Sequence, residues 1–237
     1  MKTLWLDLKR AISRQSFWFT VFLTMAVLWI GLGPQAAYLL SDIITGYRPP
    51  WNYLLYNTLR SSTSVLTLPA LVALPYALNE CMELQTGYFR YALIRSCRSN
   101  YCYAKVFGCL FASVVAQSFA LILAVGLGIF FGNFDVGYVN CQMLSACVLA
   151  RLLCTGIWSS IAGASGMLTR ITSAVFLVPL AISYTLSMLG RRILSQIPWL
   201  DPSSWLTGET QLLPLLLLLV CTSLHFLAVW MEVQKRG

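Results

Sequence analysis

The chain has 237 residues, of which 58% are hydrophobic and 10% are charged, and its mean hydropathy is +0.73. This excess of apolar residues excludes an ordinary soluble domain, whose composition is about half apolar and about a quarter charged. The net charge of +8 does not indicate nucleic-acid binding, because the basic residues are scattered in short segments between apolar runs, as in membrane proteins.

The eight cysteines have no regular spacing that would indicate a disulfide framework or a zinc site. Four of them lie within apolar runs, and three lie in or beside one polar segment, at Cys81, Cys97 and Cys102. We therefore expect this chain to bind no metal and no cofactor of its own.

Apolar residues recur at helical spacing from Lys2 to Ser16, with charged residues largely on the other side. This pattern predicts a helix that lies in the membrane interface, and the alternative is a first span that begins early, in water. The N-terminal stretch also resembles a signal peptide, but its apolar part is long and five further candidates follow. We therefore expect a retained first span.

Six apolar runs are long enough to cross a bilayer as helices. The first, about residues 17–44, contains glycines and a proline that can bend a spanning helix without breaking it. A loop follows at Pro49 and Pro50, because a proline pair excludes helix. The second span, about residues 62–79, has prolines that we expect to kink it.

The remaining spans are predicted at about residues 103–131, 141–168, 173–189 and 212–231. Turns or loops join them at residues 132–140, 169–172 and 190–211. The whole chain, residues 1–237, then forms one domain, and the predicted fold class is an all-α membrane protein with six transmembrane helices.

The distribution of basic residues predicts the orientation of this layout. Eleven of the sixteen fall on the inner side and four on the outer side, while Arg151 lies within the fourth span. The positive-inside tendency then places both termini in the cytoplasm of a multi-pass plasma-membrane protein. Arg191 and Arg192 fall on the outer side, against the overall bias.

The polar segment between the second and third spans carries the clearest functional pattern. An acidic residue precedes a glycine, a short apolar and basic stretch follows, and a basic residue opens the third span. This pattern resembles the first cytoplasmic loop of ABC-2-type exporter permeases. The matching positions are Glu83, Gly87, Leu93, Ile94, Arg98 and Lys105.

The same segment departs from that family at two positions. Gln85 stands where many members have a second acidic residue, and Tyr88 stands where a small hydroxyl residue is common. The resemblance covers the layout of the whole chain and the motif of about 25 residues.

The resemblance implies a coupling helix that docks on a cytosolic ABC ATPase. Tyr88, Leu93 and Ile94 would hold this helix parallel to the membrane, with basic side chains facing water at Arg90, Arg95 and Arg98. It also implies a homodimer or a heterodimer with a related permease that exports an amphipathic substrate through the lipid bilayer. The alternative is an ordinary basic loop with interfacial aromatic residues.

The 237 residues contain no GxxxxGKS or GxxxxGKT phosphate loop. ATP and Mg would therefore be bound by the partner ATPase, and the chain by itself is not expected to be an enzyme. The sequence contains no motif that identifies the substrate.

Three residues within the spans are candidates for a substrate path: Arg151, Trp158 and His225. An intramembrane histidine can relay protons or bind ligands. The only carboxylate in the same span is Glu232 at its end, so a packing role for His225 is favoured. Arg151 can alternatively extend towards the outer interface.

Small residues line the fourth span from Gly156 to Gly166, which permits close helix packing. In the outer segment at residues 190–211, the resemblance implies short re-entrant helices before the last span. The alternative is a loop anchored among lipid headgroups.

Two further functional classes remain open. An ion-coupled secondary transporter normally uses intramembrane carboxylates or inverted repeats, and the six predicted spans contain almost no central carboxylate. An intramembrane enzyme would need a base and an orienting group at one membrane depth, and the sequence does not contain such a set.

Overall fold

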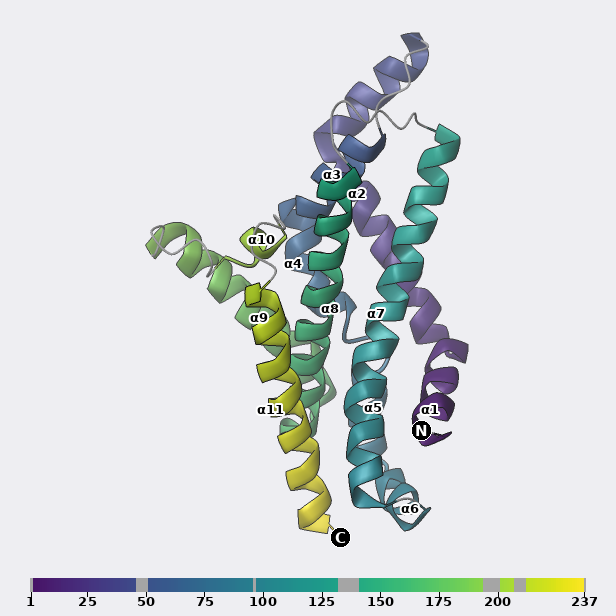
Figure 1. Ribbon diagram of the computed structural model, residues 1–237, viewed down its shortest axis with the longest axis vertical. Helices are drawn as coiled ribbons and strands as arrows, with labels where there is room; N and C mark the ends of the chain where they lie inside the picture. The colour runs from purple at the N-terminus through teal and green to yellow at the C-terminus, as the bar shows by residue number, and fades with distance from the viewer. Residues whose placement is uncertain are drawn as a thin grey trace.

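The computed structural model describes residues 2–45, 51–95, 97–131, 141–193, 201–206 and 212–236, and these contain helices and no strand. The helices form one elongated bundle (Figure 1). Both termini and the short helix α6 (Tyr88–Arg95) lie towards the same end, which we call the α6 end. The predicted turns at Pro49 and Pro50 and at residues 132–140 lie outside the described residues.

The N-terminal helix is separate from the first long helix. Helix α1 (Lys2–Ser13) meets α2 (Gln15–Thr45) at a bend of 62°. Ala11 is buried against the bundle, whereas Trp5 on another side of α1 is 67% exposed. This amphipathic arrangement favours the predicted interfacial helix over a first span that simply begins early.

The prediction for residues 51–79 was incomplete. A helix that the sequence did not predict, α3 (Trp51–Arg60), precedes the predicted second span. The predicted second span is two helices, α4 (Ser62–Leu71) and α5 (Ala77–Gln85), separated by turns at residues 72–76. The chain breaks next to Pro75, while Pro69 lies inside α4.

The remaining helices follow the predicted runs closely. After α6 come α7 (Arg98–Phe131), α8 (Cys141–Thr169) and α9 (Thr172–Met188), which continues into a short π-helix, η1 (Leu189–Ile193). The chain ends with α10 (Pro202–Trp205) and α11 (Leu212–Arg236). The predicted turn at residues 169–172 is therefore confirmed between α8 and α9, while its position on the inner side stays a prediction.

In the described residues, three helices are long and apolar enough to cross a membrane, namely α7, α8 and α11. The bent pair of α1 and α2 makes a fourth if it counts as one span. The chain is thus an all-α membrane protein. Helix α4 has only 10 residues and α9 has 17, so the six-span layout stays a prediction.

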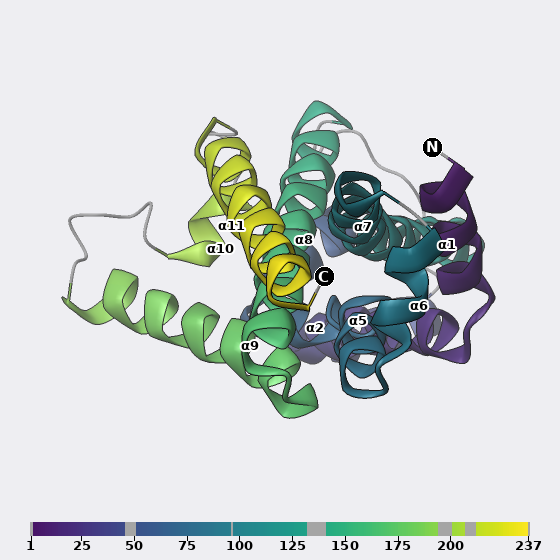
Figure 2. The same cartoon turned by 90° about the horizontal axis from the view of Figure 1, so that it is seen from below.

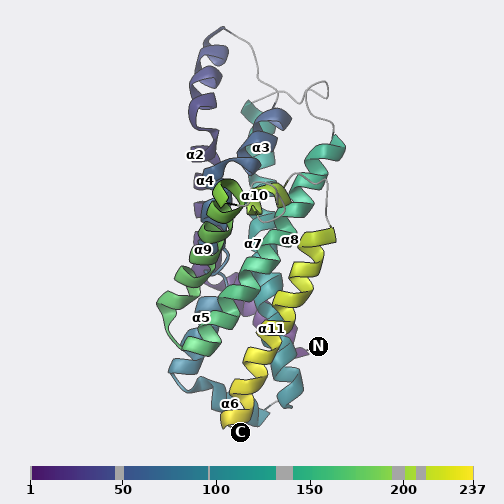
Figure 3. The same ribbon diagram turned by 90° about the vertical axis from the view of Figure 1, so that its left-hand side faces the viewer.

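Helix α8 lies at the centre of the bundle, in contact with α7, α9 and α11 (Figures 2 and 3). Its small residues allow this packing, as predicted. A Cβ atom on Gly156 would lie 2.8 Å from the side chain of Leu218 on α11, and one on Gly166 would lie 2.8 Å from Val175 on α9. These distances are too short for a larger residue to fit without movement of the neighbour.

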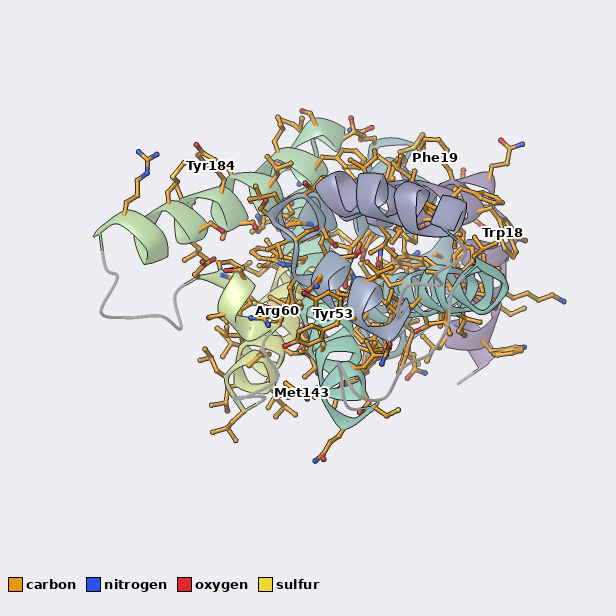
Figure 4. All side chains as sticks on the ribbon, turned by 90° about the horizontal axis from the view of Figure 1, so that it is seen from above. Trp18, Phe19, Tyr53, Arg60, Met143 and Tyr184 are labelled. Carbon is orange, nitrogen blue, oxygen red and sulfur yellow. The ribbon has the colours of Figure 1, made fainter. Side chains whose placement is uncertain are left out.

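Helix α9 leans away from the other helices towards its C-terminal end (Figures 1 and 2). An apolar groove of about 500 Å³ lies between α9, α2 and α4. Its lining includes Leu23, Val27, Leu66, Leu71, Leu180 and Tyr184. Large side chains also project from the outer surface of the bundle, where Trp18, Phe19 and Tyr184 are 43%, 58% and 50% exposed (Figure 4).

Candidate functional site

The turn between α5 and α6 depends on a glycine. Gly87 has a φ of +73°, a left-handed conformation that side chains with a Cβ atom rarely adopt. A Cβ atom there would meet nothing within 4 Å, so the backbone conformation rather than space favours glycine. The amide of Thr86 donates to the carbonyl of Met82 at 2.9 Å, which ends α5 immediately before the turn.

Helix α6 is attached to the bundle by one side only. Phe89 is fully buried and packs edge-on against Tyr101 of α7, with ring centroids 5.2 Å apart. Leu93 is partly buried in the same cluster, whereas Ile94 is 82% exposed and Tyr91 is 68% exposed. An apolar face of α6 therefore points away from the protein's own core.

The basic residues of this segment have different positions. Arg90 and Arg95 belong to α6, but their side chains lie outside the described part of the chain. Arg98 is the first residue of α7, and its surface is exposed. Lys105 lies well inside α7 and is 4% exposed, although its position at the predicted start of the third span suggested a more accessible residue.

Lys105 joins α5 to α7 through an ion pair with Glu83. Its Nζ atom donates to Oε2 of Glu83 at 2.5 Å. The same ammonium group lies 5.3 Å from the ring centroid of Tyr76 and 5.5 Å from that of Tyr101, within cation–π range. Glu83 and Lys105, two of the residues that carry the family resemblance, thus contact each other directly.

Arg170 makes a second connection at the α6 end, which the sequence did not predict. It lies in the turn between α8 and α9 with a φ of 58°. Its carbonyl accepts from Nε2 of Gln85 at 2.7 Å, and its Nη2 donates to Oε1 of Glu232 at 2.7 Å. Gln85, which departs from the family pattern, therefore links α5 to this turn.

A cavity of about 400 Å³ opens between α1, α5 and the start of α6. Two guanidinium groups and one carboxylate line it from α1 and the bend after it, and one carboxylate lines it from α5. Its lining includes Asp7, Arg10, Arg14, Asn79, Glu83 and Tyr88. The interfacial helix and the loop that carries the family resemblance thus border one hollow.

No family model and no curated protein matches this chain. Its function must therefore be inferred from the site itself.

The three predicted substrate-path residues have separate surroundings. Arg151 is fully buried in α8, and its Nη1 donates to the hydroxyl of Ser64 in α4 at 2.7 Å. Its Nε and Nη2 have no hydrogen-bond partner. Trp158, two turns further along α8, stacks on Trp205 of α10 with ring centroids 6.2 Å apart.

The short helix α10 lies within the predicted outer segment and packs into the bundle. Trp205 is 6% exposed, and Asp201 caps the helix by accepting from the amide of Ser203 at 3.0 Å. A Cβ atom on Gly190 would lie 2.8 Å from the backbone nitrogen of Asp201, so the glycine permits this close approach. Residues 194–200 and 207–211 of the outer segment lie outside the described part.

His225 has a carboxylate neighbour that its own helix did not suggest. Its Nε2 lies 3.5 Å from Oε2 of Glu80 in α5, and both side chains are buried. The sequence placed Glu80 at the start of a cytoplasmic segment. In the structure, Glu80 lies within α5, which begins after the turns at residues 72–76, and its carboxylate lies next to His225 of α11.

Proposed function

We propose that this chain is the transmembrane permease subunit of an ABC exporter, which uses ATP hydrolysed by a separate ATPase subunit. The observation that carries the proposal is α6, a short helix with an exposed apolar face at the end of the bundle where both termini lie. The ion pair of Glu83 and Lys105, which joins α5 to α7, also supports the proposal. Ile94, which the sequence led us to expect against the membrane, would in this proposal belong to an exposed face that receives a soluble partner.

A displacement of α6 would be transmitted to other helices through a small number of polar contacts. The ion pair of Glu83 and Lys105 joins α5 to α7, and Arg170 joins α5 to α11 and to the turn between α8 and α9. A partner that shifts α6 would therefore move α5, α7 and α11 together with the turn between α8 and α9. ATP and Mg would be bound by that partner and not by this chain.

In the proposed layout, six spans cross the plasma membrane with both termini in the cytoplasm. The second span combines α4 and α5, and the fifth is α9. Two copies, or this chain with a related permease, would enclose the path. The apolar groove between α2, α4 and α9 suits the apolar part of an amphipathic substrate, and Arg151, Trp158 and His225 would contribute to the path.

The test is co-purification of the full chain in detergent with ABC ATPase subunits encoded in the same genome, followed by measurement of ATP turnover. We compare the wild type with Ile94→Glu, because Ile94 is the most exposed apolar residue of α6. Met143→Glu is the control, since Met143 is also exposed, at 54%, but lies on α8 near the opposite end (Figure 4).

The proposal predicts that the wild type and Met143→Glu bind the ATPase and that Ile94→Glu does not. All three should unfold at the same temperature, since neither side chain contributes to the core. If the wild type binds no ATPase, or if Ile94→Glu binds as well as the wild type, the permease assignment is wrong.

A further inference from the structure

Two ionisable side chains meet in the interior between α5 and α11. Glu80 is 2% exposed and His225 is fully buried. Their closest polar atoms are 3.5 Å apart, and no hydrogen bond to another group satisfies either carboxylate oxygen or either imidazole nitrogen. Seven residues separate His225 from Glu232 along α11, so the pair lies about 10 Å further into the bundle than the ion pair of Arg170 and Glu232.

Helix α8 holds the imidazole in this position. A Cβ atom on Gly163 would lie 2.4 Å from Cε1 of His225 and 2.5 Å from Nε2. The ring therefore occupies the space that any larger residue at position 163 would need. One turn further along α8, Gly166 is packed close to Cys81, the neighbour of Glu80. The three helices thus enclose the pair.

The charge of the pair determines what it can bind. With one proton between them, the two side chains are neutral in sum, either as carboxylate and imidazolium or as carboxylic acid and imidazole. Losing that proton or gaining a second leaves a net charge away from water, which is unfavourable. Among the described residues there is no group of three potential ligands for a metal ion, so a proton is the ligand that fits.

We propose that Glu80 and His225 form an intramembrane proton-binding site in which the two side chains share one proton. The proton exchanges with water only when α5 separates from α11. Since α5 leads directly into α6, any partner that moves α6 would also change access to this site. The proton-binding site itself requires no ATPase, because both of its side chains belong to this chain.

Other ionisable groups around Glu80 come from α5, from α7 and from the turn before α5. Electrostatic interactions with Glu80 reach Tyr76, Cys81, Tyr101, Cys102, Lys105 and Cys109. Lys105 is the only cation among them, and its ammonium group is already bonded to Glu83. On α11, Glu232 is bonded to Arg170. His225 is therefore the group best placed to share a proton with Glu80.

The composition of the chain provides a selective test. His225 is the only histidine among the 237 residues, so ¹⁵N-labelled histidine gives a single imidazole in the nuclear magnetic resonance spectrum of the full chain in lipid nanodiscs. In the wild type, we expect the ring nitrogen signals of an imidazole that shares a proton with a neighbouring carboxylate.

In Glu80→Gln the imidazole loses its partner, so its signals should differ from those of the wild type at the same pH. Asp7→Asn is the control, because it removes a carboxylate from α1, outside the three helices that enclose the pair, and should leave the His225 signals in place. Wild-type ring nitrogen signals equal to those of free histidine in water would overturn the proposal, and this comparison remains decisive if Glu80→Gln does not fold. A ring that does not respond to Glu80→Gln would also overturn it.

Discussion

At the scale of single residues, Gly163 is the position with the least room for change. Its backbone lies against the ring of His225, where a Cβ atom would come within 2.4 Å of a ring carbon. We expect Gly163→Ala to lower the stability by about 1–3 kcal/mol, because overpacking forces the buried ring to move. The midpoint of thermal unfolding in detergent measures this effect.

Gly126→Ala on α7 is the matched control. A Cβ atom at Gly126 meets nothing within 4 Å, so alanine should leave the midpoint unchanged or raise it by the equivalent of about 0.5–1 kcal/mol. Equal destabilisation by both substitutions would show that the contact between Gly163 and His225 is not tight.

The buried guanidinium of Arg151 depends on Ser64. The hydroxyl of Ser64 accepts its hydrogen bond at 2.7 Å, while two other nitrogens of the group have no hydrogen-bond partner. We expect Ser64→Ala to cost about 1.5–3 kcal/mol, the range for hydrogen bonds to charged groups. A double-mutant cycle with Arg151→Met should remove most of that cost, because no buried charge then remains to be satisfied.

Thr67→Ala in the same helix is the comparison for that cycle. The hydroxyl of Thr67 bonds only to the carbonyl of Thr63 within α4, so its loss should change the stability by less than about 0.5 kcal/mol in either background. If Ser64→Ala is equally harmless, the bond to Arg151 contributes nothing to the fold.

At the scale of elements, the ion pair of Glu83 and Lys105 fixes α5 against α7. Lys105→Met leaves a largely buried carboxylate without its partner, and we expect a loss of about 1–3 kcal/mol. The charge-reversed pair Glu83→Lys with Lys105→Glu should recover part of this loss. Full recovery is not expected, because the cation–π contacts with Tyr76 and Tyr101 would be absent.

The pair of Asp7 and Arg10 on α1 provides the control for this prediction. Its atoms are 3.7 Å apart and its arginine is 61% exposed, so water screens the interaction. Arg10→Met should change the unfolding midpoint by the equivalent of less than about 0.5 kcal/mol. A similar loss from both pairs would contradict the assigned role of Lys105.

The long helices could be predicted from the sequence because each corresponds to an uninterrupted apolar run. Helix α3 could not, since its polar residues Asn52 and Asn57 follow a proline pair and resemble a loop. The burial of Glu80 was also missed. Its immediate neighbours include Asn79 and lead into a polar segment, and its contact with His225 depends on tertiary packing between helices far apart in the sequence.

For the segment that resembles ABC-2-type permeases, the secondary structure was predicted better than the contacts between its residues. The short helix α6 was expected, and so was a glycine before it. The pairing of Glu83 with Lys105 was not, because nothing in the local pattern indicates that residues of α5 and α7 face each other. Arg170 carried no signal beyond its place in a short turn, since a non-glycine residue with a positive φ is rare.

At the scale of the whole molecule, two native cysteines report on the orientation in the membrane. Cys97, before α7, and Cys141, at the start of α8, are exposed at opposite ends of the bundle. The proposed layout predicts that a membrane-impermeant thiol reagent modifies Cys141 in intact cells. Cys97 should react only after the membrane is opened, because the α6 end faces the cytoplasm.

The single variants Cys97→Ser and Cys141→Ser assign each modification, and mass spectrometry of peptides measures it. Five other cysteines are buried and should not react in either condition, which makes them internal controls. Modification of Cys97 in intact cells would reverse the proposed orientation and would remove α6 from the reach of a cytosolic partner.

Arg170 connects α5, α11 and the turn between α8 and α9 at the α6 end of the bundle. The carbonyl that accepts from Gln85 belongs to the backbone and cannot change rotamer, whereas the guanidinium of the same residue holds Glu232. A displacement of α5 would therefore be transmitted to the turn between α8 and α9 and from there to α11. In mechanical terms, we expect the connected helices at this end to move as one unit, with the break at residues 72–76 as the place where α5 can bend relative to α4.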